Sequence, residues 1–405
     1  MKKEVVIIGH GYSSRLGVIR SLADLDCYIT IIAIVFHRQV GRYLRFEGGK
    51  PIDCYSKYVD RVIYCHVKED LISLLLKRCI SHDQKVILIP DSDLSASLID
   101  KNQERLKDYF VFPNINHCPG AVEYWMNKSL QKSLAQIIGL SVAEGQVVTI
   151  KDGRYVFPLI TRYPCFTKPL VTNCGGKQFF KRCDNEEDLR CVLDYISRIT
   201  DIDVLVEDFK DINAEYAVVG FSDSKEVVIP GVIEFVESSR SHKGIAREGI
   251  IKPIRGFEVF IGLLKEYVRT VGYYGLFDID FYKSDGILYF CEMNLRFGGS
   301  GYAYTAMGIN LPEMFVRSIC GESIDKLKFK VTDEASFANE RMCIDDWVAG
   351  AISKEEMLDI INKVNIRFVY NEIDNGPQRK LNRYIRGQAI KKLLKRWLGK
   401  RLKTG

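Results

Sequence analysis

The chain has 405 residues, 47% of them hydrophobic and 27% charged, which excludes a disordered or fibrous protein and allows one to three globular domains. No apolar run is long enough to cross a membrane, and the sequence enters an apolar stretch at once without a cleavage-site pattern, so we predict a cytoplasmic protein. The net charge is +6, but residues 379–403 hold eleven Lys and Arg, so the preceding chain sums to −5 and the basic tail needs its own explanation.

Short β-branched runs alternate with helical patterns through the first ninety residues. Strands are predicted at 5–9, 28–35, 59–66 and 86–90, and helices at 13–25 and 69–80. This alternation predicts a doubly wound parallel sheet. The segment GHGYSSRLG (9–17) is only loosely like a dinucleotide fingerprint, and a plain strand-to-helix turn is the favoured interpretation.

The proline- and glycine-containing segment 112–125 is read as a domain junction. Beyond it, a helix is predicted at 127–138. Strand-rich sequence follows from 147 to about 235, interrupted by a predicted helix at 186–199, and another helix is predicted at 256–272. Residues 275–294 are read as two strands joined by a turn at 284–286.

Polar side chains recur at every second position of the second of these strands, in YFCEMNLRFGGSG (289–301). Glu292, Asn294 and Arg296 therefore share one face, and Asp280 on the partner strand can join it. Carboxylate and amide oxygens suit magnesium bound together with phosphates, and the guanidinium suits an anion. FGGSG then offers backbone N–H groups before the next helix. A solvated edge strand is less favoured, because the intervening residues are apolar.

Upstream segments supply matching parts for a nucleotide, although each is weak alone. Lys168 lies in an apolar strand before a proline, and Lys128 begins the helix after the junction; a solvated lysine is the simpler interpretation of either. The segment 171–181 is a glycine-containing loop or a plain hairpin turn. VLVEDF (204–209) is a strand end that could present backbone groups to adenine, with Glu215 available to a ribose.

Taken together, these residues resemble the ATP-grasp superfamily over about residues 1–330. The Asp280-to-Glu292 spacing is similar to biotin carboxylase, with similarity also to carbamoyl phosphate synthetase. EMNLRFGGSG is similar to the carboxylate–amine ligase branch, and 85–113 to D-aspartate ligase-like proteins. The resemblance implies a doubly wound domain at 1–118, then an ATP-grasp domain at 119–330 of two α+β subdomains (147–210 and 211–330). An extension (331–378) and the tail (379–405) follow.

The resemblance also assigns roles residue by residue. It places ATP against Lys128, Lys168, Gly175, Gly176, Lys177, Glu207, Asp208, Phe209 and Glu215. It assigns Asp280, Glu292 and Asn294 to two magnesium ions, with manganese as a substitute, although Asp278 could replace Asp280 as the ligand. Arg296, together with Lys168, takes the catalytic role of stabilising the transferred phosphoryl group.

The implied activity is an ATP-dependent carboxylate–amine ligase that forms an amide through an acyl phosphate. Its substrates would be a small carboxylate and an amine, and a homodimer is allowed. A carboxylase or thiol ligase is the enzymatic alternative, less favoured because no carrier sequence is present; a non-catalytic nucleotide-binding scaffold is the other. His242, Lys243 and Arg247 are substrate-side candidates in the segment 237–249. No C-x-x-C pair or histidine cluster suggests zinc or a nucleophile.

The basic tail is predicted to be an amphipathic helix over 379–403, with an apolar stripe on one side. The stripe consists of Ile385, Ala389, Leu393, Leu394, Trp397 and Leu398. Packing on the protein body is the favoured interpretation. An anionic membrane surface is the second, which would place the protein at the inner face of the membrane and suit an envelope or glycan precursor as substrate. Nucleic acid is the least favoured partner.

Overall fold

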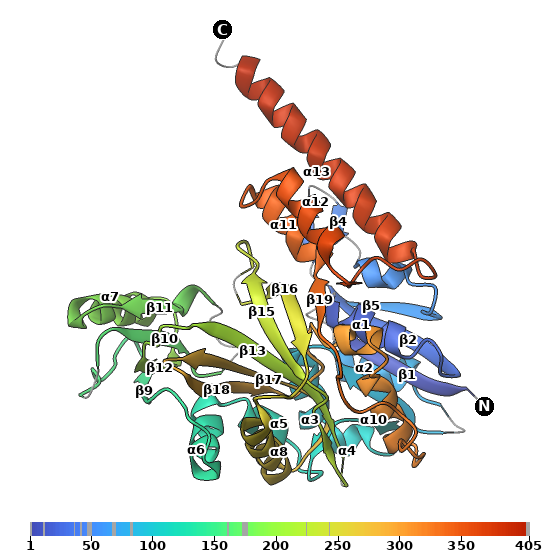
Figure 1. The fold of residues 1–405 in the computed structure, drawn as a ribbon, viewed down its shortest axis with the longest axis horizontal. Helices are drawn as coiled ribbons and strands as arrows, with labels where there is room; N and C mark the ends of the chain where they lie inside the picture. The colour runs from blue at the N-terminus through green and yellow to red at the C-terminus, as the bar shows by residue number, and fades with distance from the viewer. Residues whose placement is uncertain are drawn as a thin grey trace.

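A computed structural model of the chain shows three larger sheets and a C-terminal helical extension (Figure 1). The structure describes residues 2–10, 13–35, 37–40, 43–46, 51–66, 70–81, 84–159, 162–171, 177–223, 225–242 and 244–401.

The first sheet is parallel and has the strand order β5-β2-β1-β6-β7, as expected for a doubly wound unit. Its strands are β1 (Lys3–Gly9), β2 (Cys27–Val35), β5 (Arg61–His66), β6 (Val86–Pro90) and β7 (Phe110–Val111). Its helices are α1 (Ser13–Ser21), α2 (Leu71–Arg78), α3 (Asp93–Lys101) and α4 (Gln103–Leu106). The other elements here are β3 (His37–Val40), β4 (Tyr43–Phe46) and η1 (Ile52–Tyr55). The four predicted strands are confirmed because continuous β-branched runs suit strands buried on both faces.

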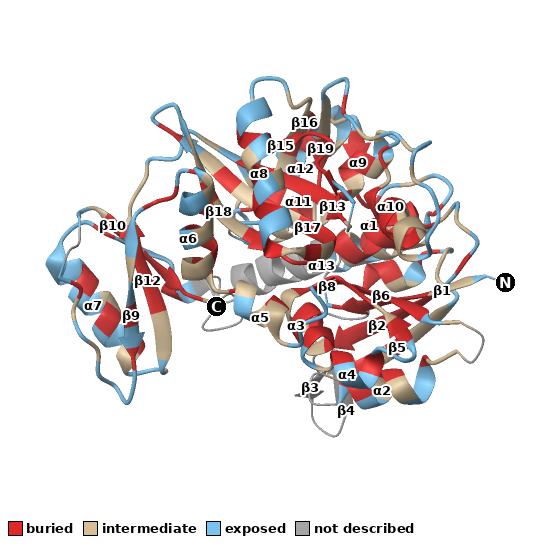
Figure 2. Cartoon of the chain, turned by 90° about the horizontal axis from the view of Figure 1, so that it is seen from below, coloured by how far each residue is buried: buried red, intermediate tan, exposed pale blue. Residues whose placement is uncertain are grey.

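A small antiparallel sheet, with the order β11-β10-β12-β9, forms a separate lobe (Figure 2). It consists of β9 (Gly145–Ile150), β10 (Cys165–Pro169), β11 (Lys181–Cys183) and β12 (Ile202–Asp208). One face is covered by α7 (Glu186–Ser197), whose Leu189, Leu193 and Ile196 are fully buried against the sheet. This i, i+4, i+7 spacing is the reason that the sequence predicted the helix. The single turn η2 (Lys177–Phe179) precedes β11.

The central sheet runs β18-β17-β13-β15-β16-β19-β20, with β14 and β8 paired at its side. Its strands are β8 (Asn114–Ile115), β13 (Ala214–Ser222), β14 (Val227–Val228), β15 (Val232–Ser238), β16 (Ala246–Lys252), β17 (Tyr273–Ser284), β18 (Ile287–Asn294), β19 (Ala335–Ala338) and β20 (Ile366–Arg367). The neighbouring helices are α5 (Ala121–Trp125), α6 (Lys128–Ile138), α8 (Glu258–Val271), α9 (Tyr302–Ala306) and α10 (Leu311–Ile319). The predicted hairpin is confirmed, with Asp285 and Gly286 at positive φ in its turn.

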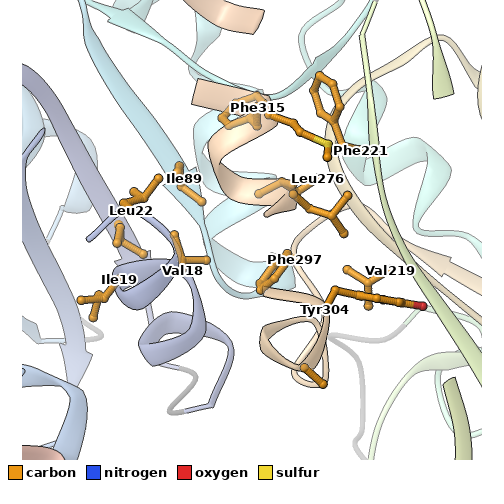
Figure 3. Packing of buried hydrophobic residues seen from close by; sticks show 14 of the residues in the cluster. Val18, Ile19, Leu22, Ile89, Val219, Phe221, Leu276, Phe297, Tyr304 and Phe315 are labelled. Atoms are coloured by element: carbon orange, nitrogen blue, oxygen red, sulfur yellow. The ribbon is translucent and has the colours of Figure 1, made fainter. Parts of the chain in front are cut away.

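The parallel sheet and the central sheet share one hydrophobic core. Val18 and Leu22 of α1 belong to the same buried cluster as Val219 of β13, Phe297 and Phe315 (Figure 3). Two sequence-distant units are therefore joined by apolar packing, which fixes the carboxyl edge of the parallel sheet beside the central sheet.

The C-terminal extension consists of α11 (Glu340–Ala349), α12 (Lys354–Lys363) and α13 (Gly376–Arg401). Buried Arg20 of α1 bonds to Asp374, at 3.0 Å, immediately before α13. The predicted tail helix is confirmed, and its first turns pack on the body through Leu381, Tyr384 and Ile385. Farther along, the helix projects away from the body (Figure 1), and Ile390 is 58% exposed. The side chains of the other residues in the predicted stripe, from Ala389 onward, lie outside the described part of the structure.

Among the helices that the structure describes, none combines the length and apolar character needed to span a bilayer.

Candidate active site

A cleft of about 600 Å³ lies between the small sheet and the central sheet. The predicted residues that line it are Lys128, Lys168, Glu207, Asp208, Phe209, Glu215, Asp280 and Glu292. These side chains come from α6, from β10 and the end of β12 in the small sheet, and from β13, β17 and β18 in the central sheet. A larger crevice, of about 800 Å³ between β7 and α8, contains none of the predicted site residues, so the chemistry-bearing groups single out the smaller cleft.

The floor of the cleft is the β17–β18 hairpin. In its antiparallel register Asp280 lies opposite Glu292 and Asp278 opposite Asn294. Cys291 is an extra residue at a bulge, because the next pair joins Phe281 to Phe290. The Asn294 amide donates to Asp280 at 3.3 Å. The acidic and amide groups therefore gather on one face, as strand alternation predicts.

Negative charge is crowded at this hairpin. Burial raises the pKa of Asp280 well above its usual range, and the nearby Asp278 and Glu292 raise it further. Burial also raises the pKa of Asp278 to about 6, with Arg296 acting in the opposite direction. Carboxylates held this close would be relieved by a cation, so the donor set fits a magnesium ion.

Within the described ranges, no three His, Cys, Asp or Glu side chains form a metal cluster by themselves. Magnesium does not require one, since it takes one or two carboxylates together with phosphate oxygens and water.

Lys128 reaches the hairpin from the first turn of α6 and pairs with Glu292. Asn127 caps this helix by accepting from Ser129 and Leu130, at 2.9 and 3.2 Å. Gln131 ties the helix to β18, because its side chain bonds both backbone groups of Met293. These contacts fix Lys128 against the acidic face.

A second buried ion cluster closes the side of the cleft toward the small sheet. Glu207 pairs with Lys168, at 2.7 Å, and with Lys132. Sequence reasoning missed Lys132, although it stands one helical turn after Lys128 and so shares its face of α6. Glu207 belongs to the strand end predicted to form the adenine edge, and its carboxylate bridges these two lysines.

The pKa shifts in this cluster follow from burial and charge. Burial raises the pKa of Glu207, but Lys168 and Lys132 outweigh it, so the net shift is downward. Burial disfavours the charge of Lys168, yet Glu207, together with Cys291 and Glu292, raises its pKa on balance. Burial, with the neighbouring Lys168, lowers the pKa of Lys132. Lys168 is therefore a dehydrated cation on the cleft wall.

Arg296 lies just beyond the lining, where the central sheet meets the parallel sheet. Its guanidinium bonds Asp93, at 3.1 Å from Nε, and Asp278, at 3.4 Å from Nη1. Burial opposes its charge, but the surrounding carboxylates, Asp93 and Asp278 foremost, raise its pKa on balance. Asp93, the first residue of α3, was not expected here, because nothing local in the sequence links two residues 203 positions apart.

The glycine segment after Arg296 differs from the expectation of an exposed anion site. The helix that follows, α9, has only five residues, and the N–H of Gly301 donates to Gly298 at 3.1 Å. Gly298 packs so closely on Asp278 that an added Cβ would lie 2.8 Å from its carboxyl carbon. These glycines therefore permit close packing behind the acidic face.

The remaining predicted residues lie at the rim or outside the described chain. Glu215 of β13 accepts from Ser238 at 3.4 Å, and Phe209 stacks against Arg182, whose guanidinium lies 4.5 Å from its ring centre. Gly175, Gly176 and Lys243 lie outside the described residues, as does the side chain of Lys177, which begins η2.

The sequence has detectable relatives, although no protein-family model matches it. It is 24% identical over 217 residues to the carbamoyl phosphate synthase large chain of Gemmatimonas aurantiaca, covering 52% of this chain and 20% of the relative. The corresponding protein of Corynebacterium glutamicum is 27% identical over 194 residues, covering 46% and 17%. The chain thus matches about a fifth of these relatives' length.

Solved structures of similar fold cover most of the chain. N5-carboxyaminoimidazole synthetase from Staphylococcus aureus matches with a TM-score of 0.61, 14% identity and 87% of each chain. L-amino acid ligase from Bacillus licheniformis matches at 0.61 and 16%, over 83% of this chain and 80% of that one. The biotin carboxylase domain of a Hydrogenobacter thermophilus carboxylase, solved with MgADP and bicarbonate, matches at 0.61 and 18%, over 83% and 74%. The chain therefore has the ATP-grasp fold that these ligases share.

Proposed function

We propose that the chain is an ATP-dependent carboxylate–amine ligase that forms an amide through an acyl phosphate. One observation carries this proposal: the buried lysines Lys128 and Lys168 line the same cleft as the carboxylates of Asp280 and Glu292, which lie opposite each other in the hairpin. Positively charged side chains beside a cleft of this size suit a triphosphate. The similar structures solved with ADP or MgADP support the same occupant.

The side chains divide the chemistry between them. A substrate carboxylate oxygen would attack the γ-phosphorus of ATP, the bond to the ADP oxygen would break, and an acyl phosphate would form. Lys128 and Lys168 would hold the phosphates, and Arg296 would stabilise charge on the transferred group. The amine nitrogen would then attack the acyl carbon, lose a proton and displace inorganic phosphate.

Asp280, Glu292 and Asn294 would hold magnesium, which supplies charge neutralisation at the β- and γ-phosphates when bound. The proposal includes two ions, with manganese as a substitute. The pairing of Lys128 with Glu292 supports a role for both residues at this point, since each would exchange its partner for a ligand of matching charge. Asp278 is the less suitable ligand, because it is already bonded to Arg296.

Bicarbonate is a second candidate for the carboxylate. The solved carboxylase domain that resembles this chain carries bicarbonate and MgADP together, and the matched relatives are carbamoyl phosphate synthases. Activation of bicarbonate would use the same side chains and yield carboxyphosphate in place of an acyl phosphate. The test must therefore include it.

The first experiment is magnesium-dependent release of ADP and phosphate by the purified protein. Pools of L-amino acids, D-amino acids, small dicarboxylates and bicarbonate would be supplied, with Glu292→Gln as the inactive control. Release that depends on one pool and disappears in the control supports the ligase and begins to name its substrate. Absence of ATP binding would refute the nucleotide function of the cleft.

A further inference from the structure

Residues 239–241, which follow β15, are held by a buried carboxylate from the C-terminal extension. Asp346 of α11 accepts five hydrogen bonds, from the hydroxyls of Ser239 and Ser241, the backbone N–H of Arg240 and Ser241, and the guanidinium of Arg247. The distances run from 2.6 to 3.2 Å. Asp346 and Arg247 are 0% and 2% exposed, so this is an interior contact.

The connection between β15 and β16 also forms part of the cleft wall. Ser238, at its start, and Gly244, near its end, both line the cleft. Ser238 also donates to Glu215, a cleft residue, at 3.4 Å. A continuous set of contacts therefore runs from α11 through residues 239–241 to the rim of the nucleotide cleft.

The strand geometry shows why an outside contact is needed. The β15–β16 ladder shifts register at Phe235, Glu237 and Ser238, immediately before this connection. Bulges weaken the ladder and leave backbone groups without strand partners. Asp346 accepts from two of the backbone N–H groups that follow, and Arg240 adds a bond to the carbonyl of Ala351, at 2.8 Å.

We propose that Asp346 is a positioning residue: by fixing residues 239–241 it holds Ser238 against Glu215 and thereby sets the affinity of the cleft for nucleotide, an inference that rests on the proposed ATP site. The donors around Asp346 hold its carboxylate in the charged form, so its pKa is lowered to about 2. The extension therefore serves the cleft from outside, without contributing a group to it.

The test compares Asp346→Asn with Glu340→Gln. In the first variant an amide NH₂ would replace the carboxylate oxygen that accepts from the backbone N–H of Arg240 and the guanidinium of Arg247. These two donors would then face another donor and lose their acceptor. Glu340 is the matched control, because it is also a buried carboxylate of α11 but accepts from the backbone of Val369 and Tyr370, both at 2.8 Å, away from the connection. Both variants should lose thermal stability.

The affinity for MgATP should distinguish the two variants. By calorimetric titration, Asp346→Asn should weaken MgATP binding about tenfold, the equivalent of one lost hydrogen bond, and Glu340→Gln should leave it within about twofold. Amide hydrogen exchange should quicken at Arg240 and Ser241 in the first variant alone. Equal effects of both variants, or unchanged affinity in both, would overturn the positioning role.

If Asp346→Asn does not fold, the double variant Ser239→Ala, Ser241→Ala removes two donors while keeping the buried charge, and it should also weaken MgATP binding; unchanged affinity there overturns the inference. If the wild-type protein binds no MgATP, the proposed function fails first and the inference fails with it.

Discussion

Replacement of Lys168 by methionine gives the sharpest test of the cleft chemistry, because Lys132→Met is available as a matched control. Both lysines are buried and both pair with Glu207. Lys168 lines the cleft, whereas Lys132 turns to the carbonyl of Ala143, at 3.1 Å, and does not line it. Of these two lysines, only Lys168 can therefore contact a phosphate in the cleft.

The expected magnitudes follow from this geometry. Either variant leaves Glu207 with one cation in place of two, so each should lose about 1–3 kcal/mol of unfolding free energy. Lys168→Met also removes one charge-assisted hydrogen bond to a phosphate, which is worth about 1.5–3 kcal/mol, or roughly a 10- to 150-fold rise in the Kd for MgATP.

Urea unfolding would report the first quantity and calorimetric titration with MgATP the second. Both variants should lose similar stability, and only Lys168→Met should lose much of its affinity for MgATP. If both variants bind MgATP equally, whether tightly or weakly, Lys168 does not contact the nucleotide directly and the assignment of the cleft wall is wrong.

Other predictions concern the metal ligands, the stability of the protein at acid pH and the tail. Asp280→Asn and Glu292→Gln should each reduce magnesium-dependent ADP release at least about 100-fold, while Asp278→Asn should retain its affinity for the metal. Metal affinity would be measured by titration with manganese followed by electron paramagnetic resonance. If Asp278 were the ligand, Asp278→Asn would lose that affinity and Asp280→Asn would keep it. Because the folded pKa of Asp346 is lowered to about 2 from 3.8, its stabilising contribution is present above about pH 4 and lost as the pH falls toward 2. The stability gap between wild type and Asp346→Asn in urea should therefore narrow over that range, and a constant gap would contradict the assigned shift. Truncation after Ile390 should leave the melting temperature unchanged, because Leu381, Tyr384 and Ile385 keep their packing, and vesicle flotation with anionic lipid before and after truncation would show whether the tail binds membranes.

The local pattern of the sequence was sufficient for the elements and for part of the site. Continuous β-branched runs predicted the strands of the parallel sheet, and the two-residue period after Cys291 predicted the acidic face opposite Asp280. Hydrophobic periodicity predicted α6, α7 and α8 within a few residues. These features depend on neighbours within one helix or one hairpin, where side-chain direction follows from spacing alone.

Only the tertiary structure brought together groups that no local pattern connects. Asp93 reaches Arg296 because the shared apolar core fixes two sheets side by side, and Asp346 reaches Ser239 across 107 positions. Lys132 meets Glu207, a residue of the cleft wall that lies 75 positions away in the small sheet. Such contacts are set by how whole elements pack, and packing depends on shape and burial summed over many residues. The sequence thus determined which side chains each element presents, and the packing of elements decided which of them meet.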